Sequence, residues 1–387
     1  MGYKLRILHV SKRYWPFVGG VERYVRDLAV AQRRAGHDVR VLTIDHDVLG
    51  VVTERLPRRE AHEGIDVWRV HAVGGQRKQV LAEWPSEVLR QVRRADVIHH
   101  HDPRFLLETV LTVAGLARRP VIFHTHGMIL HTRAYYRLKR LVLRGYYGPL
   151  LSVGTAAIVA GSQADATLMA EYCGIGADRV RLFLNAIDLE RYGRIDRRPA
   201  AGRLLCFGRI DVHKGLDRLL DVLAAVPGSW QLDVAGEGPR TVVELLRRRA
   251  ATLGLAERVT WHGRVSDENL DELLAQAALV LFPSRFEGFG LALVEALAAG
   301  CPVLASEIPS HREILASGLP DRLLDFDSPD ASRRLAAVLA TGVADPSGTT
   351  AVFRAQAARF SIERLAGQIE GLYHELGLAD RASTTGH

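Results

Sequence analysis

The sequence predicts an α/β protein built from two doubly wound domains. Short apolar runs rich in β-branched residues alternate with longer amphipathic stretches along the chain, a pattern typical of parallel sheets covered by helices on both faces. The alternation occurs in two series, separated by a stretch with no apolar period. The length of 387 residues also exceeds that of a usual single domain.

Each series has its own set of expected strands. The first series comprises Leu5–Val10, Asp38–Ile44, Ile65–His71, Asp96–His100, Pro120–Thr125, Ala156–Ala160 and Val180–Leu184. The second comprises Arg203–Arg209, Gln231–Ala235, Arg258–His262, Ala278–Phe282 and Pro302–Ser306. Helix-period segments lie between most of these runs, so each series predicts parallel strands joined by helical crossovers.

The domain boundary is expected within RYGRIDRRPAAG, residues 191–202, where charged and small residues carry no apolar period. We therefore assign residues 1–195 to an N-terminal domain and residues 196–360 to a C-terminal domain. Residues 361–377 predict a terminal helix that packs back on the N-terminal domain. Its apolar residues share one helical face: Ile362, Leu365, Ile369, Leu372 and Leu376.

The composition excludes several classes of protein. Hydrophobic residues make up 48% and charged residues 25% of the chain, which is ordinary for a globular protein and excludes dominant disorder. No uncharged apolar stretch reaches the ~18–20 residues that a transmembrane helix needs. The first residues enter a strand-like segment rather than a signal peptide. The three cysteines form no CxxC pair, so we expect no disulfide framework and a cytoplasmic protein.

The charge is unevenly distributed along the chain. The formal net charge is +7, with 30 basic and 19 acidic residues in the segment 1–195 and 21 basic and 25 acidic residues in the rest. A basic half indicates an anionic partner such as a membrane surface, an acidic acceptor or a nucleic acid. Because no RNP-like, zinc-finger or helix-turn-helix signature is present, we expect no nucleic acid. Peripheral contact with the inner face of an anionic membrane remains an expectation.

The strongest motif is SRFEGFGLALVEALAAGCPV, Ser284–Val303. It follows an expected buried strand, and its glycines mark a tight loop that enters a helix, so in a doubly wound domain it lies where ligands bind. The amides of Phe289, Gly290 and Leu291 would face an anion at the helix start. Glu287 and Glu295 can both face one ligand, as acceptors from sugar and ribose hydroxyls, although both could instead be ordinary surface acids.

Two further segments offer groups for a phosphate. In FGRIDVHKG, Phe207–Gly215, an arginine ends the first strand of the second series and a lysine opens the next helix, so both cations reach the edge where a diphosphate would sit. In WPFVGGV, Trp15–Val21, Gly19 and Gly20 allow close backbone approach at a helix start. Neither this segment nor Gly236–Pro239 has the full dinucleotide fingerprint.

These segments, in this order and spacing, resemble the family-4 retaining glycosyltransferases of GT-B fold. The resemblance spans nearly the whole chain and includes YWPFVGGVERYVRDLAVAQRRAGHDVRVLT, DVIHHHDP, HTHG, LNAID, GEGP, VTWHGRV and two glutamates separated by seven residues. The glutamate pair with the upstream arginine and lysine is its most specific part. Ala186 departs from the pattern, because the family usually has glycine there.

The resemblance implies a GT-B architecture, with two doubly wound Rossmann-like domains facing across a deep cleft. It also implies transfer of a sugar from a nucleotide-diphosphate-sugar donor to a hydroxyl of a glycan, lipid-linked or small-molecule acceptor. The anomeric configuration would be retained, and neither a metal nor another cofactor would be required.

The resemblance further implies roles for single residues. Arg209 and Lys214 would neutralise the donor diphosphate, Glu295 would hold the ribose and Glu287 the transferred sugar. His126, in the first domain, would reach across the cleft toward the sugar. The catalytic candidates are His126, Glu287, Arg209 and Lys214. The donor-binding candidates are Gly19, Gly20, Arg209, Lys214, Arg264, Val265, Glu287, Gly288, Phe289, Gly290, Leu291 and Glu295, with Gly20 near the diphosphate and acceptor oxygen and Arg264 and Val265 beside the nucleobase.

Acceptor contacts are expected from loops of the N-terminal domain. The candidates are Tyr14, Trp15, His101, Arg133 and Arg137. Tyr14 and Trp15 either stack on an apolar face of the acceptor or pack their own loop. Arginines recur with helical spacing between His131 and Tyr147, so this helix either touches anionic lipid or an acidic acceptor, or is a solvated face.

No metal site is expected. On a strand, His99 and His101 share one face and His100 faces the other, and no cysteine or distant carboxylate completes a ligand set. Two Asp-x-Asp sequences, at 45–47 and 325–327, resemble the motif of metal-dependent glycosyltransferases of another fold and are expected to be loop acids.

Rival functions are a GT-B sugar-nucleotide epimerase and a non-catalytic protein that binds a nucleotide sugar or nucleic acid. A phosphorylase would need a lysine that anchors pyridoxal phosphate, and no segment supports one. A dehydrogenase would need a third spaced glycine and a later acidic residue. An epimerase would alter the donor without an acceptor, so an assay with donor alone would reveal it.

Overall fold

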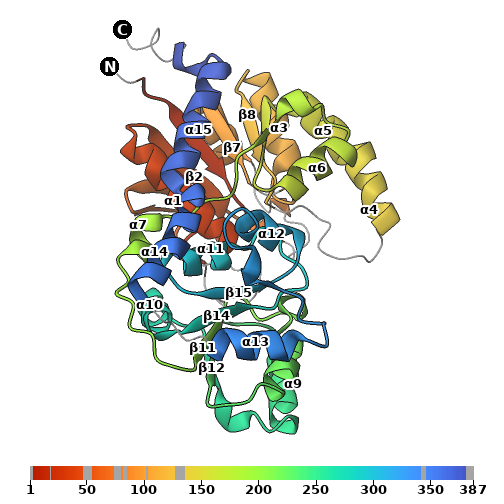
Figure 1. Ribbon diagram of the computed structural model, residues 1–387. Coiled ribbons are helices and arrows are strands. Elements are labelled where there is room, and N and C mark those ends of the chain that lie inside the picture. Colours follow the sequence, from red (N-terminus) through yellow and green to blue (C-terminus); the bar gives the residue numbers. More distant parts are fainter. Residues whose placement is uncertain are drawn as a thin grey trace. The chain divides into compact units, whose positions relative to one another are not determined.

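The computed structural model describes residues 3–17, 19–46, 55–73, 80–81, 85–101, 103–126, 136–340 and 346–380. The chain forms two compact units, residues Met1–Ile187 with Ile362–His387, and residues Asp188–Ser361. Both are α/β units with doubly wound sheets, as the sequence predicts (Figure 1).

The first unit is built on an eight-stranded sheet of order β10-β9-β8-β7-β1-β2-β4-β3, in which only β3 is antiparallel to its neighbour. Its strands are β1 (Arg6–Val10), β2 (Asp38–Ile44), β3 (Arg59–His62), β4 (Ile65–Val70), β7 (Val97–His100), β8 (Val121–His124), β9 (Ala157–Ala160) and β10 (Val180–Leu182). A separate two-stranded ribbon joins β5 (Ala72–Val73) and β6 (Val80–Leu81).

Helices cover both faces of this sheet. They are α1 (Gly20–Arg34), α2 (Ser86–Arg94), α3 (Leu107–Leu116), α4 (Tyr136–Val142), α5 (Gly148–Gly154), α6 (Gln163–Glu171) and α15 (Ile362–Glu375), with a π-helical turn at Leu143–Tyr147. Residues in and just before β1 divide between two cores: Leu5 and Ile7 pack with α1 and α15, whereas Leu8 and Val10 pack with α2 and α3. This is the two-sided burial that its continuous apolar strands predict.

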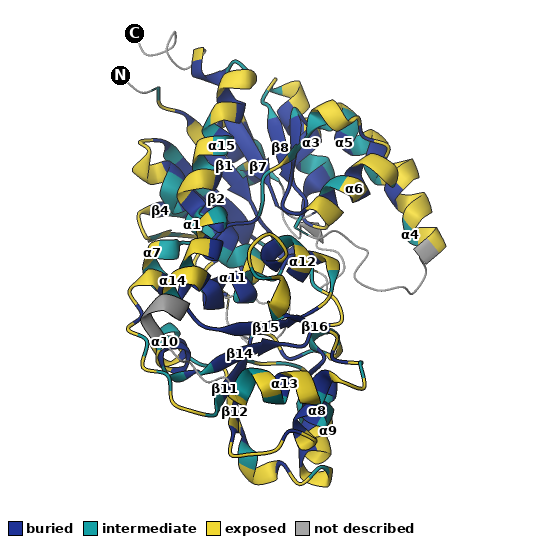
Figure 2. Ribbon diagram, in the orientation of Figure 1, coloured by how far each residue is buried: buried dark blue, intermediate teal, exposed yellow. Residues whose placement is uncertain are grey.

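The second unit has a six-stranded, wholly parallel sheet of order β13-β12-β11-β14-β15-β16. Its strands are β11 (Arg203–Phe207), β12 (Gln231–Ala235), β13 (Val259–Gly263), β14 (Leu279–Phe282), β15 (Val303–Ser306) and β16 (Leu323–Leu324). Its helices are α7 (Leu189–Gly193), α8 (Leu216–Ala224), α9 (Arg240–Thr252), α10 (Asp267–Gln276), α11 (Leu291–Ala298), α12 (Pro309–Leu315), α13 (Ala331–Ala340) and α14 (Pro346–Ala357). The central strands of both sheets are buried, whereas β3, β10 and most of β13 are half-buried or exposed, and the helices expose their outer faces (Figure 2).

The first unit ends at Ile187 and the second begins at Asp188, earlier in the sequence than the predicted boundary between residues 195 and 196. Asp188 caps the start of α7 by accepting hydrogen bonds from the amides of Glu190 and Arg191 at 3.0 and 3.3 Å, and α7 contacts α11 of the second unit. Arg197 donates to the carbonyl of Ala277 at 2.6 Å. The segment without apolar period is therefore attached to the second unit by capping and hydrogen bonds, which leave little trace in hydropathy.

The terminal helix α15 lies in the first unit, where it packs against α1 (Figure 1). Its apolar face, including Leu365, Ile369 and Leu372, is buried in the same core as β1 and β2. No helix in the described part of the chain has the length and hydropathy to cross a bilayer.

Candidate active site

The second sheet changes direction of winding between β11 and β14. From β11 the strands continue outward to β13, and from β14 they continue the other way to β16. Because β11 and β14 are parallel neighbours, the loops that follow them leave the same edge of the sheet side by side. This is the position where doubly wound sheets bind ligands. The two strongest sequence motifs are these two loops, residues 208–215 and 283–290.

The two loops touch at a glycine. Gly215 ends the 3-10 turn Val212–Lys214 with a φ of +65°, and a Cβ there would lie 2.1 Å from the carbonyl oxygen of Pro283. Beside it, the amide of Arg285 donates to the carbonyl of His213 at 2.7 Å. A side chain at position 215 would force the loops apart, so glycine is required for their contact.

An ion pair joins the loops where they meet. The Lys214 ammonium donates to the Glu287 carboxylate, and the Ser284 hydroxyl donates to the same carboxylate oxygen at 2.8 Å. The two charged side chains are 24% and 14% exposed. Burial alone would raise the pKa of Glu287, but Lys214, His311 and the two hydrogen bonds outweigh burial and lower that pKa. Glu287 is therefore an ionised acceptor at neutral pH and cannot act as a general acid.

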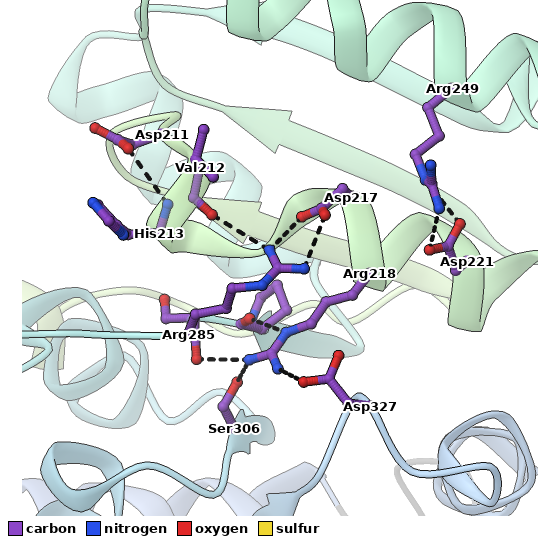
Figure 3. Close-up of polar contacts among 12 residues, drawn as sticks. Asp211, Val212, His213, Asp217, Arg218, Asp221, Arg249, Arg285, Ser306 and Asp327 are labelled. Atoms are coloured by element: carbon purple, nitrogen blue, oxygen red, sulfur yellow. Dashed lines mark hydrogen bonds and ion pairs between the residues drawn. The ribbon is translucent and has the colours of Figure 1, made fainter. Parts of the chain in front are cut away.

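A buried arginine from α8 holds the second loop in place. Arg218 donates to the carbonyl of Pro283 at 2.8 Å, to that of Ser284 at 2.7 Å and to the hydroxyl of Ser306 at 2.9 Å (Figure 3). It also pairs with Asp327 at 2.6 Å. Thus Asp327, the second acid of one Asp-x-Asp sequence, serves an ion pair. Sequence reasoning missed Arg218; its only trace is a charge inside the apolar helix LDRLLDVLA.

A second arginine links the two loops from outside. Arg285 makes a bidentate pair with Asp217 of α8 at 2.6 and 2.9 Å (Figure 3). Burial would raise the pKa of Asp217, but the hydrogen bonds and charge of Arg285 lower it. Two guanidinium groups, Arg218 of α8 and Arg285 of the loop itself, therefore hold the loop that carries Glu287 to α8.

Arg209, the other predicted cation of this site, is far more exposed than Lys214. Arg209 follows β11 with its side chain 72% exposed, and its guanidinium lies 3.7 Å from the carboxylate of Asp211. An exposed, weakly paired guanidinium is available to an anion at the switch point. The sequence predicts that Arg209 ends this strand, whereas β11 ends at Phe207 and Arg209 lies in the loop beyond it.

The other predicted donor contacts lie on the loops after β13 and β14 and on α11. Arg264 is exposed and Val265 half-buried after β13. Gly288 is half-buried, and Phe289 is buried against Phe360 with ring centroids 5.7 Å apart. Only the backbone of Phe289 can therefore face a ligand. Glu295, on α11, is 5% exposed.

The start of α11 lies against a buried histidine. Gly290 has a φ of +107°, and its Cβ position would be 3.4 Å from the His311 ring. The first backbone hydrogen bond runs from Leu293 to the Gly290 carbonyl, so the amide of Leu291 precedes the bonded turn. His311 donates from Nδ1 to the Ser306 carbonyl at 3.0 Å, and its buried Nε2 has no partner within the described ranges. Burial lowers the pKa of His311 to about 4.

In the first unit, the predicted contacts after β1 divide into exposed and buried groups. Gly19 and Gly20 form the start of α1. Tyr14 is 1% exposed and packs in the core, so its ring does not face an acceptor. Trp15 is 41% exposed and stacks on His62 with ring centroids 4.1 Å apart. The loop-packing alternative therefore describes Tyr14, and Trp15 keeps an exposed ring.

His126 follows β8 at the carboxyl edge of the first sheet. It has a φ of +43°, which is unusual for a residue with a side chain. Its Nε2 is 3.0 Å from Nδ1 of His101, whose Nε2 is 2.9 Å from His9. His101 is 2% exposed. The hydrogen bonds of His101 are thus internal, and an acceptor cannot reach it while these bonds persist.

Among the residues that the structure describes, two groups of side chains are close enough to hold a metal ion. They are His101, His124 and His126, and Asp45, His46 and His71. In the first group His101 and His126 are bonded to each other through ring nitrogens, so a metal would have to displace that bond. His99 and His101 share one face of their strand as predicted, because both stack on His9.

The last acceptor candidates lie around α4. Arg137 is exposed on α4, and Arg133 falls outside the described residues. Arg140 lies over the ring of Tyr172 at 5.0 Å, so part of the expected basic stripe packs on the protein.

Two family models match the chain. Residues 18–191 match "Glycosyltransferase Family 4", and residues 197–342 match "Glycosyl transferases group 1". The two matches cover the two units separately, and the second contains both loops of the switch point.

Characterised relatives align along nearly the whole chain. A GDP-mannose:cellobiosyl-diphosphopolyprenol α-mannosyltransferase from Komagataeibacter xylinus is 31% identical over 380 residues, covering 96% of this chain and 93% of the relative. The enzyme of the same name from Xanthomonas campestris is 28% identical over 96% of this chain and 97% of its own length. A phosphatidyl-myo-inositol mannosyltransferase from Mycobacterium tuberculosis is 28% identical over 84% of this chain and 83% of its own.

Solved structures share the fold. HepE from Anabaena, crystallised with UDP and glucose, superposes with a TM-score of 0.72 at 22% identity, over 96% of this chain and 100% of that one. Sucrose-phosphate synthase from Thermosynechococcus elongatus superposes with a TM-score of 0.71 at 22% identity, over 96% and 99%. With both units and both family models in agreement, the chain belongs to glycosyltransferase family 4, a family of GT-B enzymes.

Proposed function

We propose that this glycosyltransferase moves a sugar from a nucleoside diphosphate sugar to a hydroxyl group, retains the anomeric configuration and requires no metal. The observation that carries the proposal is the Lys214–Glu287 pair, held between two loops at the switch point of the second sheet. The ammonium can bind the diphosphate of a nucleotide sugar. The neighbouring carboxylate, which only accepts hydrogen bonds, can bind the hydroxyls of its sugar.

The chemistry follows from where charge develops. As the glycosidic bond breaks, negative charge grows on the leaving diphosphate, so fixed positive charge there lowers the barrier. Lys214, Arg209 and the first amides of α11 supply that charge. Glu287 accepts hydrogen bonds from hydroxyls of the transferred sugar, and His126 contacts a substrate hydroxyl. Attack from the same face as the departing phosphate would give retention.

We propose a mannosyl donor and a lipid-linked acceptor as the first substrates to test. The support is that the relatives from Komagataeibacter and Xanthomonas are named for GDP-mannose and a diphosphopolyprenol acceptor, and the mycobacterial relative for phosphatidyl-myo-inositol. These proteins share 28–31% identity with this chain over most of its length.

The test begins with the donor. Thermal shift and slow hydrolysis are measured with GDP-mannose and with glucose donors of UDP, ADP, GDP and dTDP, in buffer and in EDTA. One donor should raise the melting temperature and be hydrolysed equally in EDTA. NMR of the transferred product should show the donor's anomeric configuration. Loss of activity in EDTA that added metal restores would contradict metal independence, and an inverted product would contradict retention.

Variants then test whether Lys214 is needed for transfer from that donor. Lys214→Gln should lower the transfer rate by roughly 10²–10³, the cost of removing one donor to a developing oxyanion. Lys4→Gln, at an exposed lysine of the first unit, is the matched control. Equal rates for Lys214→Gln and the wild type would overturn the site. An altered nucleotide sugar formed without an acceptor would instead indicate an epimerase, and binding without turnover would indicate a binding protein.

We also propose peripheral contact with an anionic membrane on the cytoplasmic side, through the segment 137–153. It exposes Leu138, Leu141 and Val153 at 58%, 69% and 89% beside basic residues such as Arg137. Exposed apolar groups with basic neighbours favour an anionic interface. Sedimentation with phosphatidylglycerol vesicles, but not with phosphatidylcholine vesicles, should follow. Leu138→Ser/Leu141→Ser should abolish it, and binding that survives this double change would contradict the assignment.

A further inference from the structure

Eight buried or half-buried side chains of the first unit form one continuous chain of hydrogen bonds around Gln32 on α1. On one side the amide oxygen of Gln32 lies 2.7 Å from Nε2 of His9. Nδ1 of His9 lies 2.9 Å from Nε2 of His101, and Nδ1 of His101 lies 3.0 Å from Nε2 of His126. His126 is the only half-buried member; the others are at most 2% exposed.

The second side of the chain begins at the amide nitrogen of Gln32, which donates to the hydroxyl of Tyr373 on α15 at 2.8 Å. That hydroxyl lies 2.5 Å from Nε2 of His99, and Nδ1 of His99 lies 2.7 Å from Nε2 of His124. Nδ1 of His124 lies 3.1 Å from the hydroxyl of Tyr24.

Every imidazole in the interior of this chain carries a single proton at neutral pH. Burial lowers the pKa of His9 to about 4 and lowers the pKa values of His99, His101 and His124 well below their ordinary range. A neutral imidazole donates at one nitrogen and accepts at the other. Each ring therefore transmits the direction of one hydrogen bond to the next.

Gln32 is the one member of this chain of hydrogen bonds whose donor and acceptor atoms are fixed, because no proton moves between the nitrogen and the oxygen of its amide. Its oxygen can only accept, so His9 must donate from Nε2 and accept at Nδ1. His101 must then donate from Nε2 and accept at Nδ1, and His126 must donate from Nε2. On the other side the Tyr373 hydroxyl accepts from the amide nitrogen and donates its own proton to Nε2 of His99. His99 and His124 then carry their protons on Nδ1.

We propose that Gln32 sets which ring nitrogen of His126 carries the proton, acting through His9 and His101. Gln32 is a positioning residue, because it lies on α1 and reaches His126 only through two other side chains. Turning the Gln32 amide over would reverse all five imidazoles together.

The inference rests on the proposed function, and it specifies which kind of hydrogen bond His126 can make with a substrate. With its proton on Nε2, His126 keeps a lone pair at Nδ1 and can only accept a hydrogen bond there. Such a nitrogen binds a substrate hydroxyl and repels a phosphate oxygen, which is itself an acceptor. His126 is therefore assigned to a hydroxyl of the sugar or acceptor, and not to the diphosphate.

The first measurement uses the unmodified full chain without substrate. Histidine labelled with ¹⁵N and long-range proton–nitrogen spectra near neutral pH report which nitrogen of each ring is protonated. Resonances are assigned from variants that each lack one histidine. We expect Nε2–H at His9, His101 and His126, and Nδ1–H at His99 and His124. The reverse order, or an order mixed within either side, would overturn the proposal.

The second measurement removes the amide while keeping its volume. In Gln32→Met, His126 should show both tautomers. The matched control is Gln91→Met, because Gln91 is 1% exposed on α2 and bonds Glu87 outside the chain of imidazoles. The control should keep the single tautomer of His126. A single unchanged tautomer in Gln32→Met would overturn the proposal, and the wild-type spectrum still decides if that variant does not fold.

The consequence for turnover is tested separately. If the two tautomers become equally populated, about half of the molecules remain competent, and kcat should fall about twofold or more with an unchanged donor KM. His126→Ala tests the proposed role itself. Full activity in His126→Ala would refute that role while leaving the tautomer result intact, so the two failures are distinguishable.

Discussion

At the scale of single residues, Glu287 is an ionised acceptor fixed by Lys214 and Ser284. Glu287→Gln replaces half of its acceptor capacity with an amide donor and leaves Lys214 without its counter-charge. We expect the transfer rate to fall by roughly 10²–10³, measured with the donor found in the panel. Glu307→Gln, at a pair with Arg312 whose side chains are 46% and 57% exposed, should leave the rate unchanged. A rate close to wild type for Glu287→Gln would contradict the assignment.

His311 predicts how stability depends on pH. Its folded pKa of about 4 lies below its ordinary value of 6.5, so between these values the unfolded chain binds a proton that the folded chain does not. Stability therefore falls on acidification from pH 6.5 toward 4. His311→Leu removes the group that binds this proton. The slope of the free energy of unfolding against pH should therefore become shallower by about 1.4 kcal/mol per pH unit. Urea unfolding across that window measures it. Above pH 7 a histidine that is neutral in both the folded and the unfolded chain contributes nothing to the pH dependence, so the two proteins should show the same slope there. Equal slopes over the whole pH range would contradict the prediction.

Residue types and spacing predicted part of the site and missed the rest. Lys214 and Glu287 are recognisable because they lie in glycine-containing loops after buried strands. Arg218 is not, because its partners at Pro283 and Ser284 are backbone carbonyls that any sequence would present. Tyr14 was expected as one of two alternatives, and only the packed core shows which one holds.

At the scale of elements, Arg218 couples α8 to the loop between β14 and α11. Removing it leaves the buried carbonyls of Pro283 and Ser284 without their donor, and Asp327, whose side chain is 65% exposed, without its partner. Arg218→Ala should lower the free energy of unfolding by about 3 kcal/mol and weaken donor binding as the loop loosens. Chemical denaturation and the donor thermal shift measure these effects.

The control for this change is Arg248→Ala on α9. Arg248 makes an exposed i,i+4 pair with Glu244, with side chains 73% and 54% exposed, so its loss should cost about 0.5 kcal/mol or less. Equal costs for the two variants would show that the Arg218 contacts do not stabilise the loop.

Most parallel strands could be predicted because they are buried on both faces and read as apolar runs. The expected Gln231–Ala235 and Asp38–Ile44 match β12 and β2. The antiparallel β3, with sequence REAH, and the two-residue β16 were missed. Both are edge strands or very short, and pairing rather than hydropathy defines them. The sheet order that brings the two loops together also depends on long-range pairing.

At the scale of the whole molecule, the chain leaves the first unit after Ile187 and returns to it at Ile362. Ile369, fully buried on α15, packs in the core shared with β1 and α1. Ile369→Ala should destabilise the first unit by about 2–5 kcal/mol through the cavity it leaves. Hydrogen exchange resolved by segment should show faster exchange in β1 and β2.

The control for Ile369→Ala is Glu363→Ala, at an exposed position of the same helix, which should change exchange little. If Ile369→Ala left exchange in β1 and β2 at the wild-type level, α15 would not be part of that unit's stable core.

The return of α15 also orders events during synthesis. The ribosome synthesises the whole middle segment, Asp188–Ser361, before the helix that completes the first unit. The unit that begins first is therefore finished last, and until then the α1 face of its sheet lacks Leu365, Ile369, Leu372 and Tyr373. A chain truncated before residue 362 would contain every residue of the middle unit but would leave that apolar surface of the first unit uncovered.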